Sequence, residues 1–196
     1  MISLAMIRHG PTDWNKDRRL QGRTDVPLSA EGRAAAARWR LPPGILDYHP
    51  VSSPLRRAVK TAALLGMEDP EIEPRIQEMG YGEWEGQNLD DLRRDLGREM
   101  EDNEARGLDF RAPGGESPRE VQARLTPWLT EVAARGRPTV AVSHHGILRA
   151  LLSLATGWPM TGNPPEKITW GTIHYFELDE SGNIAVDRLN VSMEPT

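Results

Sequence analysis

The chain has 196 residues, no cysteine and a formal net charge of −5. The missing cysteines exclude disulfides, thiolate nucleophiles and cysteine-based metal sites, and the acidic balance disfavours a nucleic-acid-binding protein, which must neutralise phosphates. No apolar run is long enough to span a membrane and no signal-peptide pattern is present, so we expect no membrane partner, a cytoplasmic location and a single domain over residues 1–196.

The N-terminal segment combines a predicted strand with a reactive turn. An apolar run over Ile2–Ile7 ends at Arg8 and His9, which are followed by glycine and proline. A buried parallel strand that ends in this way is typical of the ligand-binding edge of an α/β sheet. An imidazole beside a guanidinium is suited to attack on phosphorus; in the alternative interpretation Arg8 pairs with an acid and His9 caps the turn. The first strand alone does not decide between them.

The following loop and helix have different roles. The segment Gln21–Leu28 is rich in polar side chains and backbone donors, which suits the lining of a small anionic pocket. Ser29 is predicted to cap a scaffold helix that runs to about Arg40.

A second junction of strand and helix is predicted near residue 53. A strand over Tyr48–Ser52 leads into a helix that we expect to start with Ser53 as its cap and to run to about Leu65. Arg56 and Arg57 fall in its first turn, and adjacent residues of a helix point in different directions. At most one of these arginines is therefore expected to reach a site at the start of the helix, and in the alternative interpretation both lie at the surface.

The middle of the chain contains a candidate acid and a charged segment. Ile72–Pro74 is predicted to be a short edge strand, and Glu78–Gly86 places three carboxylates among glycines and aromatic residues. Aromatic neighbours desolvate an acid and raise its pKa toward that of a proton donor, but the spacing does not decide which of the three does this. Residues 88–111 are highly charged, with little apolar periodicity, and we interpret them as an insertion at the rim of the site.

The last third of the chain begins with a long helix. Ser117 and Glu120 form a capping box, with proline at the first helical position. The predicted buried stripe of this helix comprises Val121, Leu125, Trp128, Leu129 and Val132.

The clearest strand of the chain follows, and it ends in two histidines. Thr139–Ser143 runs into His144 and His145, and the next helix is expected over Ile147–Thr156. A final hairpin is predicted from strands over Thr172–Leu178 and Ile184–Asn190.

Three predicted junctions of strand and helix thus carry side chains that are, or can become, cationic. In a parallel sheet the carboxyl ends of the strands share one edge, so these groups are expected to converge. They would suit a phosphoryl group that is attacked by neutral His9 and held by the surrounding cations, with a carboxylic acid to protonate the departing alkoxide.

Four motifs, in the expected order, resemble those of the histidine phosphatase superfamily, whose members share the phosphoglycerate-mutase-like fold. They are Arg8-His9-Gly10 with Thr12 and Asn15, the L-x-R-A-x-x-T-A pattern at Leu55–Ala62, the E-x-x-x-G-x-W-E-G pattern at Glu78–Gly86, and V-S-H-x-G at Val142–Gly146. The resemblance covers nearly the whole chain. It implies a three-layer α/β/α sandwich with a mostly parallel central sheet.

The resemblance also implies a role for each matching residue. His9 becomes the phosphorylated nucleophile and Glu78 the proton donor, and Glu83 and Glu85 are then left as turn and surface residues. The implied phosphate pocket comprises Arg8, Arg57, His144 and Asn15, with Gln21 and Gly22 near the phosphate or the leaving group. Arg23 is placed on the leaving-group side, together with residues 88–111.

Within the superfamily, the sequence favours a phosphatase over a mutase. A mutase must keep water from the phosphohistidine and needs a lid, whereas this chain has only a modest insertion. The stretch Pro113–Ser117 also resembles the branch of small-molecule phosphatases. We therefore expect a phosphomonoester hydrolase acting on a small phosphorylated metabolite, with a cofactor-dependent phosphoglycerate mutase as the alternative.

One position departs from the family pattern, and two other functions are disfavoured. His145 stands where the family usually has a small residue; it either adds a donor near the phosphate or turns to solvent. A phosphate-binding module without activity is disfavoured because every catalytic position is filled. A metallohydrolase is disfavoured because adjacent histidines rarely bind one metal, so no metal and no cofactor are expected. A homodimer is left open.

Overall fold

Successive residues of the first strand point into two different hydrophobic layers. In this computed structural model, which describes residues 1–194, Leu4 and Met6 pack into one core cluster, and Ala5 and Ile7 into a second on the opposite face of the sheet. All four side chains are fully buried. This alternation is the pattern of a strand covered on both faces, as the continuous apolar run predicted.

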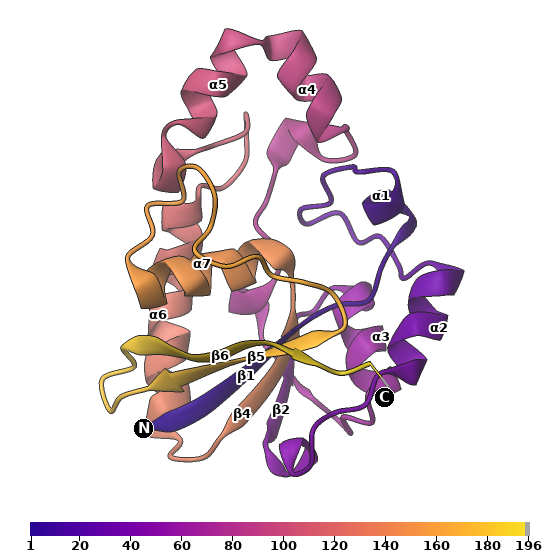
Figure 1. Ribbon diagram of the computed structural model, residues 1–196, viewed down its shortest axis with the longest axis vertical. Helices are drawn as coiled ribbons and strands as arrows, with labels where there is room; N and C mark the ends of the chain where they lie inside the picture. Colours follow the sequence, from indigo (N-terminus) through magenta and orange to yellow (C-terminus); the bar gives the residue numbers. More distant parts are fainter. Residues whose placement is uncertain (195–196) are drawn as a thin grey trace.

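Six strands form one sheet in the order β3-β2-β4-β1-β5-β6 (Figure 1). Their bounds are Ile2–Arg8 (β1), His49–Ser52 (β2), Glu71–Ile72 (β3), Thr139–Ser143 (β4), Thr172–Leu178 (β5) and Ile184–Ser192 (β6). Strands β1 to β4 are mutually parallel, whereas β5 runs antiparallel to β1, and β6 antiparallel to β5. The prediction of a mostly parallel sheet is confirmed.

Helices cover both faces of this sheet, which confirms the three-layer sandwich. The α-helices are Asp13–Lys16 (α1), Ala30–Arg38 (α2), Arg56–Leu64 (α3), Leu89–Leu96 (α4), Arg98–Glu104 (α5), Pro118–Ala134 (α6) and His145–Thr156 (α7). Short 3-10 helices span Ile45–Asp47, Pro74–Ile76, Gly82–Trp84 and Gly107–Asp109. Helices α6 and α7 pack on the face of Leu4, and α2 and α3 on the face of Ala5. No helix of the part that the structure describes is long and apolar enough to cross a membrane.

The start of each long helix tests the capping predictions. Ser29 caps α2 through Gly32, and Ser117 forms the predicted capping box with Glu120. The prediction at Ser53 is wrong, because α3 begins only at Arg56, with Leu55 in the cap position. The Ser53 hydroxyl instead lies 2.7 Å from His144 Nε2, a partner 91 residues away that no local pattern reveals. Helix α7 begins two residues earlier than predicted, at His145.

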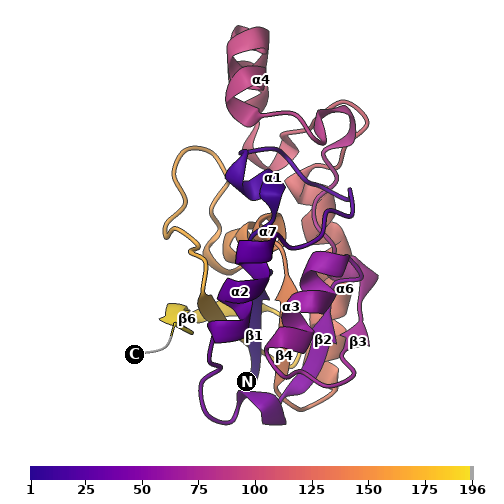
Figure 2. The same ribbon diagram turned by 90° about the vertical axis from the view of Figure 1, so that its right-hand side faces the viewer.

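The charged segment 88–111 folds as α4, α5 and a 3-10 turn that project beyond the sheet layers (Figures 1 and 2). It has a small hydrophobic cluster of its own, in which Leu92 and Met100 pack with Trp84 and Ala112. Both of its helices also carry charged pairs at their surface, such as Arg93 with Glu104 at 2.7 Å. The segment therefore has a satellite core, and Phe110 also packs against the core cluster of Leu4 and Met6.

Candidate active site

Residues that follow directly after three neighbouring strands meet at one edge of the sheet. His9, Ser53 and His144 come after β1, β2 and β4. Their positions are fixed by the end of the sheet ladder, because His9 N–H donates to Ser143 O at 2.9 Å and Ser53 N–H to Val142 O at 3.0 Å. The predicted convergence at the carboxyl ends of parallel strands is thus present.

His9 is buried, with 2% of its surface exposed, and its tautomer follows from one hydrogen bond. Nδ1 lies 2.6 Å from the carbonyl oxygen of Gly10, which can only accept, so Nδ1 carries the hydrogen. The lone pair is then on Nε2, the nitrogen that a nucleophilic attack requires. Burial and the charges of Arg57 and Arg8 hold the pKa of His9 well below its ordinary value. The imidazole is therefore neutral at neutral pH.

Arg57 is fully buried and connects the second histidine to the loop that follows Gln21. Its Nε–H donates to His144 Nδ1 at 3.3 Å, and its two amino groups donate to Gly22 O at 2.7 Å and Thr24 O at 2.9 Å. Arg56 is exposed and pairs with Asp25, so only one of the two arginines reaches the site, as predicted.

His144 differs from the sequence expectation in its charge. Because a guanidinium only donates, Nδ1 of His144 accepts from Arg57, and Nε2 donates to Ser53 Oγ. Burial and the charge of Arg57 hold the pKa of His144 well below its ordinary value. His144 therefore orients Arg57 and lies with its ring centroid 5.1 Å from that of His9, rather than adding a positive charge.

Arg8 provides the second guanidinium, and it is stacked on an aromatic ring. Its Cζ atom lies 3.6 Å from the ring centroid of Trp170, whose Nε1–H donates to His9 O at 3.2 Å. The Arg8 Nε is buried without a hydrogen-bond partner in the described chain. Burial lowers the pKa of Arg8 to about 10, although the nearby Glu78 carboxylate opposes this. A buried N–H donor beside His9 without a partner is what an anion site requires.

The Glu78 side chain is buried beside the N-terminus of α7, and a different N–H group binds each of its two carboxylate oxygens. Oε1 accepts from Met79 N–H at 2.9 Å and Oε2 from Gly146 N–H at 3.2 Å. Burial raises the pKa of this carboxyl, against the opposing effects of the two N–H donors and of Arg57 and Arg8. An acid with a raised pKa close to a nucleophile is suited to proton donation.

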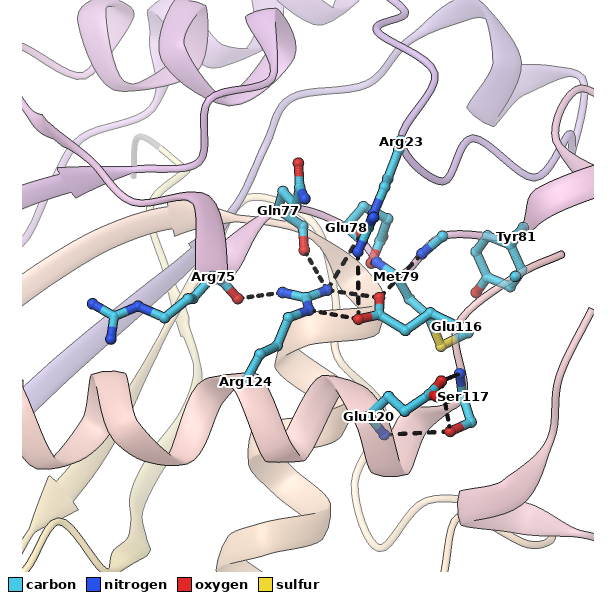
Figure 3. Close-up of polar contacts among 12 residues, drawn as sticks. Arg23, Arg75, Gln77, Glu78, Met79, Tyr81, Glu116, Ser117, Glu120 and Arg124 are labelled. Atoms are coloured by element: carbon cyan, nitrogen blue, oxygen red, sulfur yellow. Dashed lines mark hydrogen bonds and ion pairs between the residues drawn. The ribbon is translucent and has the colours of Figure 1, made fainter.

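A pair of charged side chains holds the segment that carries Glu78 (Figure 3). Arg124 of α6 donates to the carbonyl oxygens of Arg75, Gln77 and Glu78, and its Nε–H lies 2.8 Å from Glu116 Oε1. Glu116 in turn accepts from Gly80 N–H at 3.3 Å. The residues on both sides of Glu78 are thus fixed by one mostly buried ion pair.

The remaining predicted residues lie in two places. Asn15 accepts with its Oδ1 in the capping box of α1, which leaves its side-chain amide nitrogen to donate to a ligand. Gln21 is buried, and its Oε1 has no hydrogen-bond partner in the described chain. Gly22 has a φ of 53°, and a Cβ there would lie 1.9 Å from Glu85 Oε1. Arg23 lies 3.4 Å from Glu116 and lines a separate hollow with Gly80 and Glu85, and its place on the leaving-group side stays a prediction.

Glu85 has a structural role that the sequence did not predict. It was expected at the surface, but its carboxylate accepts from the N–H groups of Arg23, Thr24 and Tyr81, which ties the loop after Gln21 to the segment after Glu78.

A cavity of about 480 Å³ opens beside Glu78, lined by Met79 and Gly146. The other lining residues come mainly from residues 88–111, α7 and the loop after it, and include Tyr81, Phe110, Arg149 and Met160. His145 also lines this cavity, so of the two orientations left open it does not take the one toward solvent. Its neighbour His144 points to Ser53 and Arg57, and the two imidazoles therefore do not share a ligand position. A hollow of about 560 Å³ beside α2 and α3 is lined by Leu28, Arg33 and Val59 among others. The proposed catalytic residues line neither this hollow nor the cavity itself, which reaches Glu78 only through its neighbours Met79 and Gly146.

Comparison with known proteins identifies the family. The Histidine phosphatase superfamily (branch 1) matches over residues 4–191. The chain belongs to the histidine phosphatase superfamily. Among curated relatives, the probable phosphoglycerate mutase GpmB of Escherichia fergusonii is 34% identical over 171 residues, which cover 81% of this chain and 77% of that protein.

Solved structures of similar proteins superpose along nearly the whole chain. A mycobacterial glucosyl-3-phosphoglycerate phosphatase, in a structure with VO3, has a TM-score of 0.76 and 28% identity, and both chains are covered completely. The protein TTHB049 of Thermus thermophilus has a TM-score of 0.72 and 31% identity, and the match covers 97% of this chain and 100% of that one. The names of these similar proteins include both a phosphatase and a mutase.

Sequence reasoning missed several residues that shape this histidine phosphatase site. Trp170 precedes β5, and because β5 is antiparallel to β1, its N-terminal end lies at the catalytic edge. Ser53 directly follows β2, which is the same signal that singled out His9 and His144. No sequence pattern indicated a role for Arg124, because this role depends on where α6 packs against the segment that carries Glu78.

Proposed function

We propose that this histidine phosphatase hydrolyses a small phosphomonoester through a phosphohistidine intermediate at His9. The observation that carries the proposal is the single hydrogen bond from His9 Nδ1 to Gly10 O, which leaves a neutral Nε2 lone pair beside two arginines. This is the arrangement that nucleophilic attack on a bound phosphoryl group requires.

The first step transfers the phosphoryl group to the enzyme. His9 Nε2 forms a bond to phosphorus while the bond between phosphorus and the ester oxygen breaks. Arg8 and Arg57 offset the charge of the phosphoryl oxygens, and protonated Glu78 gives its proton to the departing alkoxide. The raised pKa of Glu78 supports this assignment.

The second step reverses the role of Glu78. Its carboxylate takes a proton from water, the water oxygen bonds to phosphorus, and the bond from phosphorus to His9 Nε2 breaks to release inorganic phosphate. Transfer to water is favoured by the charged walls of the cavity beside Glu78, which include Arg93, Glu104 and Arg149. A mutase has to exclude water at this stage.

The test is phosphate release from a panel of phosphomonoesters, including 3-phosphoglycerate, in EDTA and without added bisphosphate. We expect release by the wild-type enzyme and none by His9→Ala, with circular dichroism as the check on folding. An acid-labile phosphoryl group on His9, trapped and located by mass spectrometry, supports the intermediate directly. Near wild-type turnover by a folded His9→Ala enzyme would remove the mechanism.

The same panel distinguishes a mutase. Formation of 2-phosphoglycerate that depends on added bisphosphate, without net phosphate release, would replace hydrolysis by the mutase reaction that the printed name of the Escherichia fergusonii relative suggests.

A further inference from the structure

Trp170 makes two contacts at the catalytic edge of the sheet, one through the face of its indole ring and one through its Nε1–H group. The face lies against Arg8, whose Cζ is 3.6 Å from the ring centroid, and Nε1–H donates to His9 O at 3.2 Å. The side chain is 40% exposed and belongs to neither core cluster of the sheet. An indole at this position is therefore explained by its contacts with the site rather than by core packing.

Arg8 depends on such a contact because few other groups restrain its guanidinium. Among residues 1–194 it forms no ion pair with a carboxylate, and its buried Nε has no hydrogen-bond partner. An arginine side chain in this state can occupy several rotamers. Stacking restrains a guanidinium through its face and leaves the N–H donors at its edge free. Trp170 can therefore hold Arg8 in place without using the donors that a phosphoryl group needs.

The loop that carries Trp170 is fixed in turn by Asn190 of β6. The side-chain oxygen of Asn190 accepts from the N–H and the Oγ1–H of Thr169, both at 3.0 Å. Its amide nitrogen donates to Glu166 Oε1 at 2.7 Å and to Lys167 O at 2.9 Å. Asn190 has a φ of 55°, a left-handed conformation that asparagine adopts more readily than most residues. One side chain thus fastens the residues before Trp170 to the edge strand of the sheet.

We propose that Trp170, held by Asn190, is a positioning residue for phosphate binding, which keeps the Arg8 guanidinium in place beside His9. This inference rests on the proposed function, because it requires a phosphoryl group bound at His9, and it adds a residue to that site. Without the stacked ring, Arg8 loses its restraint in the free enzyme and has to be ordered by the ligand. The cost of ordering one long side chain weakens binding about 2- to 10-fold.

The test compares two variants at one position by their affinity for inorganic phosphate. Trp170→Phe and Trp170→Leu both remove the hydrogen bond to His9 O, but only the first keeps an aromatic face against Arg8. We expect Trp170→Leu to bind phosphate about 2- to 10-fold more weakly than Trp170→Phe. Titration calorimetry measures both dissociation constants without turnover, and inhibition of p-nitrophenyl phosphate hydrolysis by phosphate provides a second measurement.

A double-mutant cycle shows whether this difference acts through Arg8. In an Arg8→Met background the two variants at Trp170 should bind phosphate equally, because no guanidinium remains to be held. Asn190→Asp, which lacks the two amide N–H donors, should weaken phosphate binding when Arg8 is present but not in the Arg8→Met background. Arg188→Met is the control, because Arg188 stacks on Tyr175 at 4.6 Å and loss of this other stacked cation should leave phosphate affinity unchanged. Thermal melting of each variant checks that the fold is intact.

Three results overturn the inference. They are equal phosphate affinity of Trp170→Phe and Trp170→Leu, a difference between these variants that persists in the Arg8→Met background, and no binding of phosphate by the wild type. An unchanged affinity in Asn190→Asp would overturn the role of Asn190. Failure of the proposed function alone looks different: phosphate binds, but no panel ester releases phosphate and no phosphoryl group is found on His9, while the ratio between the two variants at Trp170 still tests the inference.

Discussion

Gly146 is the position where the smallest substitution should have the largest effect on proton transfer. A Cβ at this residue would lie 2.4 Å from Glu78 Oε1 and 3.3 Å from its Cδ. Because ordinary contacts of this kind exceed about 3.3 Å, Gly146→Ala must displace the carboxylate by about 1 Å. It should also break the bond from Gly146 N–H to Oε2. The main chain itself should accept alanine, which favours a helix over glycine.

A displacement of about 1 Å at a reacting group can reduce the rate by about 100-fold. We expect a loss of this size in kcat/KM for alkyl phosphates, whose alkoxide leaving group needs the proton of Glu78. For p-nitrophenyl phosphate kcat/KM should fall by less than about tenfold, because its leaving group needs no proton. The kcat for p-nitrophenyl phosphate should fall by more than its kcat/KM, because Glu78 also activates water in the second step.

The assay is steady-state kinetics on one alkyl and one aryl phosphate, with Gly146→Ala and with a second glycine variant as its control. Gly80→Ala is the matched control, because a Cβ there has its nearest contact at 3.5 Å, to Arg23, and no positive φ. This control should keep both kcat/KM values within about threefold of the wild type. Equal losses on the two substrates in Gly146→Ala, or equal effects of the two variants, would refute the assignment of Glu78 as the acid held by Gly146.

Three further predictions test the surroundings of the site. Glu78→Gln should reduce kcat/KM for alkyl phosphates at least about tenfold more than for p-nitrophenyl phosphate, and a parallel loss would place the acid elsewhere. Arg124→Lys keeps a charge but loses the forked contact with Glu116 and several hydrogen bonds to carbonyl oxygens. Urea unfolding should therefore show a free energy of unfolding lower by about 1–3 kcal/mol. An unchanged midpoint would mean that the ion pair of Arg124 and Glu116 does not hold the segment that carries Glu78. Burial lowers the pKa of four histidines in the folded state, including His174 to about 4. The unfolded chain therefore binds more protons than the folded protein below about pH 6.5. As the pH falls from there toward the folded pKa of a histidine, each histidine should lower the free energy of unfolding by up to about 1.4 kcal/mol per pH unit. Melting temperatures that do not fall from about pH 7 to about pH 5 would contradict this.

The sequence predicted the sheet and the edge that carries the site because the signals for both are local. The apolar run before His9 and the run before His144 each end in a turn, and parallel strands must share one edge. The choice between Arg56 and Arg57 also followed from helix geometry.

What the sequence did not predict depends on contacts between distant segments. The ion pair between Arg23 and Glu116, for example, joins residues that are 93 positions apart in the chain. Ser53 looked like a helix cap because serine before proline usually is one, and the partner that overrides this preference, His144, arrives from another strand. The orientation of His145 was open because it depends on whether the chain beyond α7 and residues 88–111 leave a cavity there.

The division between the sheet edge and the projecting helices has a consequence for how this enzyme can change. Arg8 and His9, at the end of β1, and Arg57, in the first turn of α3, are proposed to act on phosphorus. Much of the wall of the cavity is instead supplied by α4, α5 and the loop after α7. Because Leu92 and Met100 pack in a small core of their own, α4 and α5 can be exchanged with those of a homologue at limited cost to the main cores, provided that Phe110 is kept. A graft of this segment should therefore alter which esters are accepted while the rate on p-nitrophenyl phosphate is retained.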